Sequence, residues 1–322
     1  MSVTITAPAT ENSYAIWVAQ AEGFFTAQGL NLKLIPSSSG GADTIAVVAS
    51  GSAQFAVEDA LVPTNAIEKG ADIKYLLMPE TGDAQQLSIS ENAPGASKIK
   101  AASSATAQLK ALKGSHYTIG VSTVASSSYS FLYTATHLYG LSTESGGDVS
   151  INTLGTPQNE IVAIKAGKVD AVAGVPPTTS QEGTFSIPMD EISPFGQMAG
   201  SWLLGNDKFI ASQPKATQAV VTALVQACNF IAKNSAKAEQ DVVKALQAAD
   251  PTTTTKKAES NYQTSQPHFL SPYPAQEAYQ LLAKLTNGSP PAGPFPPYTT
   301  AVDPSFAKTA LVKLGLPVPT GS

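Results

Sequence analysis

The sequence predicts an α/β protein built from two lobes. Segments typical of strands and helices alternate between residues 3 and 173, which is the order found in mostly parallel sheets covered by helices. The chain has 322 residues, more than one hydrophobic core usually accommodates. Apolar residues make up 43% of the chain, which is enough for two cores.

The first third of the chain predicts four strands and three helices. The strands are expected at residues 3–7, 31–35, 53–57 and 73–78. The helices are expected at residues 13–28, 43–50 and 61–69. A glycine follows each helix, where it can adopt the left-handed conformation that ends helices. This order implies right-handed crossovers between parallel strands.

A second α/β unit is expected further along the chain. Its strands are predicted at residues 117–121, 149–153 and 169–173, and its helices at residues 126–139 and 158–166. Residues 92–107 are expected to form a loop with one short helix, and residues 176–200 to be irregular. A strand at residues 201–204, one or two long helices over 215–248, and helices joined by extended segments complete the chain.

Composition excludes several classes of function. Charged residues are scarce, at 13%, the net charge is −5, and all 19 basic residues are lysine. Nucleic-acid binding needs clustered basic side chains, so nucleic acid is not expected as a partner. Without arginine, the chain lacks the usual bidentate clamp for carboxylate, sulfonate or phosphate.

Three further features of the sequence bear on the cellular compartment of the protein. The single cysteine, Cys228, rules out an intramolecular disulfide. No apolar run is long enough to span a membrane, and no signal peptide is visible, because residues 1–6 lead straight into a strand. The chain is therefore interpreted either as intracellular or as a mature form with an added methionine.

Ordered blocks in both halves carry a family resemblance. The first half contains AQAEGFFTAQG at residues 19–29, followed by LNLKLIPSSSGGADTIAVVASGSAQFAVEDA. The second half contains YTIGV, STVASSSYSFL and LGTPQNEIVAIKAGKVDAVAGVPP, which ends at residue 177. Over about residues 3–240 the chain resembles the SsuA/THI5-like substrate-binding family, which includes binding proteins for nitrate, alkanesulfonates, taurine and pyrimidine precursors.

The resemblance implies a type II periplasmic-binding-protein fold with two crossover strands. One lobe would be residues 1–84 plus 200–322, and the other would be residues 85–199. A small-molecule ligand would lie in the cleft between the lobes, at the carboxyl ends of the strands. The family also implies a monomer that delivers its ligand to the permease of an ABC importer, in the periplasm or anchored outside the membrane.

Two serine-rich turns are candidate ligand contacts, because each lies between a strand and a helix. Gly and Ser at such turns offer hydroxyls and free backbone N–H groups to a ligand. An alternative is that they only cap the helices that follow. The candidates are Ser38, Ser39 and Gly40 in the first lobe, and Ser122, Ser126, Ser127, Ser128 and Tyr129 in the second.

Further candidates lie at other strand ends. Glu58 and Asp59 follow a predicted strand directly, where an acid can accept a hydrogen bond from an amine, although Asp59 also suits a helix cap. Tyr14 is placed to stack on a flat ligand, whereas Trp17 is assigned to the core. The remaining candidates are Asn12, Ser13, Gln158 and Pro176.

Catalysis is the alternative to binding, because the family includes a pyrimidine synthase and a desulfinase. A desulfinase-like route needs a reactive thiolate. Cys228 shares a helical spacing with Val221, Leu224, Val225 and Ile231, which predicts a buried packing residue. The three histidines are far apart and none pairs with the cysteine at metal-ligand spacing, so we expect no cofactor and no metal.

The missing arginines favour a neutral or cationic polar ligand, such as a nitrogen heterocycle of the pyrimidine-precursor type. Sulfonate, nitrate or another oxyanion is the alternative, held by serine hydroxyls, helix N-termini or a lysine.

Overall fold

The computed structural model divides into two compact units, which are described separately. The first unit comprises Met1–Gly82, Met198–Ala283 and Pro294–Ser322, and the second comprises Asp83–Gln197 and Lys284–Gly293. The sequence-based division placed residues 284–293 in the first lobe instead. The structure describes residues 1–37, 41–59, 61–81, 84–124, 126–176, 178–197, 200–269, 272–286 and 294–319.

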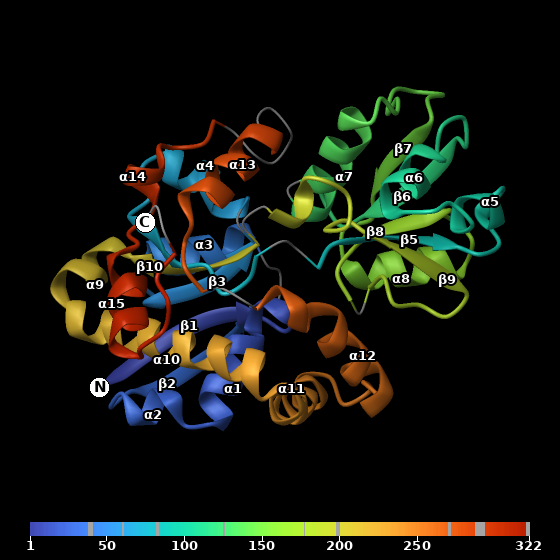
Figure 1. Cartoon of the computed structure of the whole chain (residues 1–322). Helices are drawn as coiled ribbons and strands as arrows, with labels where there is room; N and C mark the ends of the chain where they lie inside the picture. The colour runs from blue at the N-terminus through green and yellow to red at the C-terminus, as the bar shows by residue number, and fades with distance from the viewer. Residues whose placement is uncertain are drawn as a thin grey trace. The chain divides into compact units, whose positions relative to one another are not determined.

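The first unit is built on a five-stranded sheet (Figure 1). Its strands are β1 (Ser2–Pro8), β2 (Asn31–Ser37), β3 (Phe55–Asp59), β4 (Ile73–Leu77) and β10 (Ser201–Asn206), in the order β2-β1-β3-β10-β4. β1 is parallel to both β2 and β3, whereas β10 is antiparallel to β3 and β4. The sheet is therefore mixed, because β10, which comes late in the chain, is inserted antiparallel between β3 and β4 of the same unit.

Helices cover this sheet and fill much of the rest of the unit. They are η1 (Glu11–Ser13), α1 (Tyr14–Ala21), α2 (Phe24–Ala27), α3 (Ala42–Ala49), α4 (Val62–Glu68), α9 (Asp207–Ser212), α10 (Pro214–Lys233), α11 (Ser235–Ala249), α12 (Thr255–Ser265), η3 (Gln266–His268), α13 (Gln276–Thr286), α14 (Tyr298–Ala301) and α15 (Ser305–Lys313). α13 ends at residues that belong to the second unit. α10 packs against α1 and α15 (Figure 1).

The core of the first unit confirms the predicted apolar face of α10. Val221, Leu224, Cys228 and Ile231 are all buried and pack with Val3 and Ile5 of β1 in one cluster. The predicted helix over residues 13–28 is wrong in one respect. Gly23 adopts a φ of 71°, so α1 ends before it and α2 begins after it.

The second unit contains another five-stranded mixed sheet. Its strands are β5 (Gln86–Ser90), β6 (Tyr117–Val121), β7 (Val149–Thr153), β8 (Ala171–Gly174) and β9 (Thr184–Pro188), in the order β7-β6-β8-β5-β9. β6 is parallel to β7 and β8, whereas β5 is antiparallel to β8 and β9. The helices are α5 (Ala96–Lys100), α6 (Ala105–Lys110), α7 (Ser127–Leu138), α8 (Pro157–Lys165) and η2 (Phe195–Gln197).

Two strands of this sheet were missed by the sequence prediction. β5 was not identified, and β9 lies in the stretch expected to be irregular. Both are rich in polar residues, yet Ser88 is fully buried, and its hydroxyl donates to the Thr179 carbonyl over 2.7 Å. Hydrogen bonds from distant residues thus make these polar strands stable. Among the described residues, no helix is long and apolar enough to cross a membrane.

Candidate functional site

Four acidic residues lie at one edge of the first unit's sheet. β1, β3 and β4 run in the same direction, so their carboxyl ends meet at this edge. Glu58 and Asp59 end β3, Glu11 follows β1 and Glu80 follows β4. In sheets of this kind ligands bind beyond the carboxyl ends of the strands. These residues therefore form the candidate site of the first unit, which we call the acidic edge.

Glu58 is buried, with 4% of its surface exposed. Its Oε2 atom accepts a hydrogen bond from the backbone N–H of Gly41, 2.9 Å away, at the start of α3. Burial, followed by the nearby charge of Asp59, raises the pKa of Glu58 to about 7. The carboxyl group can thus change its protonation state near neutral pH.

Glu80 and Glu11 were not identified from the sequence, and both are buried. Ser201 Oγ donates to Glu80 Oε2 over 3.1 Å, whereas Glu80 Oε1 is buried without a partner in the described part of the chain. Burial and the charge of Asp59 raise the pKa of Glu80 to about 8. Burial, then the charge of Glu80, raises the pKa of Glu11 well above its usual value. Polar neighbours at strand ends were the only signal for them in the sequence.

Three predicted residues follow β1 and have different roles. Asn12 Nδ2 donates to Asp59 Oδ1 over 3.2 Å, so this amide belongs to the acidic edge. The Ser13 hydroxyl donates to the Pro8 carbonyl and thereby fixes the turn. The Tyr14 ring lies in the core and stacks on Phe269 with a centroid distance of 6.2 Å, so it packs there instead of offering a face to a ligand.

The Tyr14 hydroxyl still belongs to the surroundings of the acids. Burial raises the pKa of this hydroxyl most, and the charges of Glu11 and Glu80 raise it further. Ser38, Ser39 and Gly40, the predicted turn of the first lobe, lie outside the described residues.

The predicted turn of the second unit lies between β6 and α7. Ser126 is the N-cap of α7, because its Oγ accepts from the Tyr129 N–H over 3.2 Å and donates to the Thr123 carbonyl. Ser127 is buried, and its Oγ accepts from Gln85 Nε2 over 3.4 Å. The capping alternative therefore accounts for Ser126.

The other predicted residues of this turn are partly exposed. Ser122 and Ser128 are half-buried, and Tyr129, also half-buried, stacks on Tyr133 with a centroid distance of 6.0 Å. These side chains are available to a ligand that approaches the carboxyl end of β6.

A buried acid at the start of α8 was also missed. Gln158 is exposed in the first turn of this helix, whereas Glu160 is 2% exposed. Burial alone raises the pKa of the Glu160 carboxyl to about 8. A Cβ atom at Gly174, the last residue of β8, would lie 3.6 Å from Glu160 Oε2. Pro176 is buried two residues beyond that glycine.

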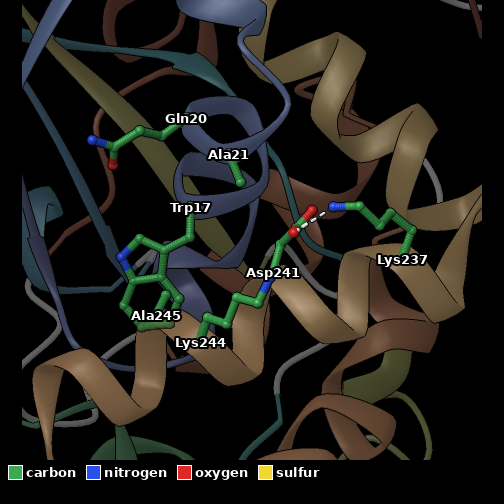
Figure 2. Close-up of a pocket in the computed structure, with 7 residues that line it drawn as sticks. All are labelled: Trp17, Gln20, Ala21, Lys237, Asp241, Lys244 and Ala245. Carbon is green, nitrogen blue, oxygen red and sulfur yellow. Dashed lines mark hydrogen bonds and ion pairs between the residues drawn. The ribbon is translucent and has the colours of Figure 1, made fainter.

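A hollow of about 470 Å³ lies elsewhere on the first unit, between α1 and α11 (Figure 2). Trp17, which is 9% exposed, lines it together with Asp241. Figure 2 shows Lys237 pointing toward Asp241, and their ion pair spans 2.6 Å. Lys237 also pairs with Glu22 over 2.7 Å. None of the four acids of the acidic edge lines this hollow.

Cys228 lies in the core and is 1% exposed. Burial, then the charge of Glu80, raises the pKa of its thiol far above the usual range. A thiol in this environment stays protonated and is a poor nucleophile. Within the described ranges, no group of three or more His, Cys, Asp or Glu residues is arranged to hold a metal ion.

The two mixed α/β sheets have counterparts among solved periplasmic-binding-type structures. The ligand-binding component of an ABC-type import system from Staphylococcus aureus, solved with zinc bound, aligns with a TM-score of 0.76 at 13% identity, covering 96% of this chain and 99% of that one. The periplasmic aliphatic sulphonate binding protein SsuA from Escherichia coli aligns with a TM-score of 0.69 at 19% identity, covering 88% and 85%.

An enzyme shares the fold as well. The desulfurization enzyme DszB aligns with a TM-score of 0.62 at 16% identity, covering 97% of this chain and 99% of that one. At these identities the likeness establishes the periplasmic-binding-protein fold. No curated protein matches the chain in a search of its sequence.

The family is established by sequence. The family model described as NMT1/THI5 like matches residues 10–238, more than two thirds of the chain. The chain therefore belongs to the NMT1/THI5-like family, which confirms the resemblance seen in the ordered blocks.

Proposed function

We propose that this protein is the solute-binding component of an ABC importer, which binds a small polar molecule and presents it to a permease. The observation that carries the proposal is the set of buried polar side chains at the carboxyl end of the sheet, above all Glu58 and Glu80. Buried carboxyls are costly unless they serve a partner, and perturbed groups of this kind are concentrated at functional sites. The family and the import-system proteins of the same fold support this reading.

The ligand we propose is a neutral or cationic nitrogen heterocycle, such as a pyrimidine precursor. Carboxyl groups accept hydrogen bonds from ring N–H and amino groups, and the chain has no arginine to clamp an anion. A sulfonate or another oxyanion is the second candidate, because the E. coli protein of the same fold is a sulphonate binding protein. The protonated carboxyl groups of Glu58 and Glu80 would then donate hydrogen bonds to the oxygens of the anion.

Binding is favoured over catalysis by the state of the thiol. DszB shows that the fold also supports an enzyme. The buried, protonated Cys228 lies in the core and lacks the exposure that a nucleophile needs. An importer component would work as a monomer, in the periplasm or anchored outside the membrane, next to its permease.

A ligand panel tests the proposal. A ligand that binds the native state raises the melting temperature by mass action, by an amount that grows with its concentration. We expect such a shift with a pyrimidine or amine in a panel that also contains sulfonates and carboxylates. Native mass spectrometry should show the ligand bound and unchanged. Conversion of the ligand into a product would support the enzyme instead.

A further inference from the structure

We propose that Tyr129 binds the ring of a planar ligand, and that this ring continues a stack of side-chain rings along α7. The inference rests on the proposed function as a solute-binding protein and specifies the shape of the ligand, an aromatic or heteroaromatic ring, independently of its charge. It concerns the second unit alone, where β6 ends and α7 begins.

Three rings stack on one another along α7, at a spacing of four residues. The Tyr129 and Tyr133 rings are nearly parallel, with an interplanar angle of 13° and a centroid distance of 6.0 Å. The His137 imidazole stacks on Tyr133 with an angle of 29° and a centroid distance of 3.9 Å. Side chains four positions apart are neighbours on one helix face, and offset-parallel rings attract one another. The Tyr133 ring is therefore held between two other rings.

Hydrogen bonds fix both ends of the stack. His137 Nδ1 lies 2.8 Å from the backbone carbonyl oxygen of Tyr133. A carbonyl oxygen only accepts, so this nitrogen carries the hydrogen and donates the bond. At the other end, the backbone N–H of Tyr129 donates to Ser126 Oγ over 3.2 Å. The Tyr129 ring is thus restrained by its backbone and by the rings behind it, which lowers the entropic cost of binding a ligand on it.

Another ring supplies the core contact of α7. Phe131 is 2% exposed and packs against Phe195 with a centroid distance of 6.0 Å. Tyr129 and Tyr133 are only half-buried, and His137 is exposed. The stack therefore lies at the margin of the buried face of α7, where part of the ring surface stays accessible.

The direction of the stack places its open end at the start of α7. Side chains of a helix lean toward its N-terminus, so each ring covers the turn before its own. Tyr129 lies in the first turn, three positions after the N-cap Ser126, so its ring leans past the end of the helix. Tyr133 is the only described aromatic side chain that stacks on it. The next place in the stack thus lies beyond the carboxyl end of β6, where ligands bind in folds of this type.

The surroundings of this place are polar and uncharged. Residues 122–138 contain no lysine and no acidic residue. Ser122 and Ser128 are half-buried near the same end of α7, and their hydroxyls can donate to or accept from polar substituents of a ring. This part of the second unit therefore selects by the shape of a ligand and not by its charge.

The experiment is isothermal titration with planar ligands and their saturated counterparts. The pairs are benzylamine with cyclohexylmethylamine, benzyl alcohol with cyclohexylmethanol, and benzenesulfonate with cyclohexanesulfonate. A cyclohexyl group is at least as apolar as a phenyl group, so apolar burial alone gives no preference for the planar member. In the charge class that binds, we expect the planar member to bind about three- to tenfold more tightly.

Variants test the ring and its support. Tyr129→Phe keeps the ring and should keep the planar preference, whereas Tyr129→Leu should abolish it. Tyr133→Leu should reduce the preference, because Tyr129 loses its stacking partner, and Tyr133→Phe should restore it. Phe185→Leu removes a half-buried ring from β9 of the same unit and should leave the preference at the parental value. Melting temperatures show that each variant is folded.

Nuclear magnetic resonance distinguishes contact from an indirect effect. Protons of a bound phenyl ring that lies over the face of Tyr129 should shift upfield, because of the ring current of the tyrosine. The shift should persist in Tyr129→Phe and disappear in Tyr129→Leu. A purely structural role of Tyr129 would leave the shift of the bound ligand unchanged.

The outcomes separate this inference from the proposed function. Saturated members that bind the parent as tightly as planar ones, or a planar preference that survives in Tyr129→Leu, would overturn the stacking site and leave the solute-binding function standing. A parent protein that binds no member of the panel would contradict both.

Discussion

The Oε2 atom of Glu58 lies 2.9 Å from the backbone nitrogen of Gly41 and accepts its hydrogen bond. The bond joins the carboxyl end of β3 to the turn that begins α3. An acid that ends one strand is thereby held beside the start of a neighbouring helix, at the edge where ligands bind in folds of this type. We therefore expect the protonation state of Glu58 to influence which ligands bind.

Glu58→Gln distinguishes a cationic ligand from an anionic one. The amide oxygen of glutamine can keep the hydrogen bond from Gly41, so we expect the fold to be retained. Affinity for an amine should fall by about 1.5–3 kcal/mol, because a charge-assisted hydrogen bond is lost. At pH 8, above the pKa of about 7 of Glu58, affinity for an oxyanion should rise, because the repulsion from the ionised carboxylate is removed. Isothermal titration measures both, and equal affinities in parent and variant would place the ligand away from Glu58.

The stability of the ligand-free protein should fall as pH rises from about 5 to 8. The pKa values of Glu58 and Glu80 are about 7 and about 8 in the folded state, above the ordinary 4.5 of a glutamate. When the pKa of a group is higher in the folded state than in the unfolded state, its stabilising contribution is fully present below the unfolded-state pKa. That contribution is lost as pH rises through the folded-state pKa. Between its unfolded-state and folded-state pKa values, each group lowers the free energy of unfolding by about 1.4 kcal/mol per pH unit.

Thermal unfolding at pH 5, 6, 7 and 8 checks this expectation. The melting temperature of the parent should decrease across the series, and that of Glu80→Gln should decrease less. Glu259→Gln, an exposed acid on α12, should follow the parent. A melting temperature that increases from pH 5 to pH 8 would contradict the assignment of buried, protonated acids.

Cys228→Ser should lower stability without affecting binding. The thiol is 1% exposed in the apolar cluster, and a hydroxyl there loses about 1–3 kcal/mol unless it finds a partner. The free energy of unfolding from urea titration measures the loss. In the parent, a thiol-specific reagent should react only after unfolding. Rapid labelling of native protein, or loss of ligand turnover at unchanged stability, would favour an enzyme.

Glu160→Gln tests the acid of the second unit. The carboxyl is buried at the start of α8, with a pKa of about 8 caused by burial. We expect the variant to melt higher than the parent at pH 8 and at the same temperature at pH 5, because the protonated acid and the amide are alike. Isothermal titration with an amine that binds the parent measures whether Glu160 also contributes to binding.

A matched control variant shows whether Glu160 contributes to ligand binding or only to the stability of the protein. Glu144→Gln changes the same charge at an exposed position of the second unit and should leave both quantities unchanged. If Glu160→Gln changes stability and leaves affinity at the parental value, Glu160 has a structural role alone.

The sequence by itself determined the features that depend on local pattern. The alternation of strand and helix segments predicted β1 to β4 and β6 to β8 with small errors at their ends. The helical spacing around Cys228 predicted its burial, because residues three and four apart share one face of a helix. Serine between a strand and a helix predicted a ligand contact, with a helix cap as the alternative, and Ser126 is the N-cap of α7.

Tertiary structure alone decided what depends on segments far apart in the chain. β10 enters the first sheet antiparallel between β3 and β4. The polar strand β9 pairs with β5, which pairs on its other side with β8. Glu11, Glu58 and Glu80 are up to 69 positions apart, yet they reach one edge because three strands run in the same direction. Sequence patterns report local periodicity, whereas the burial that raises the pKa of Glu80 arises from long-range packing.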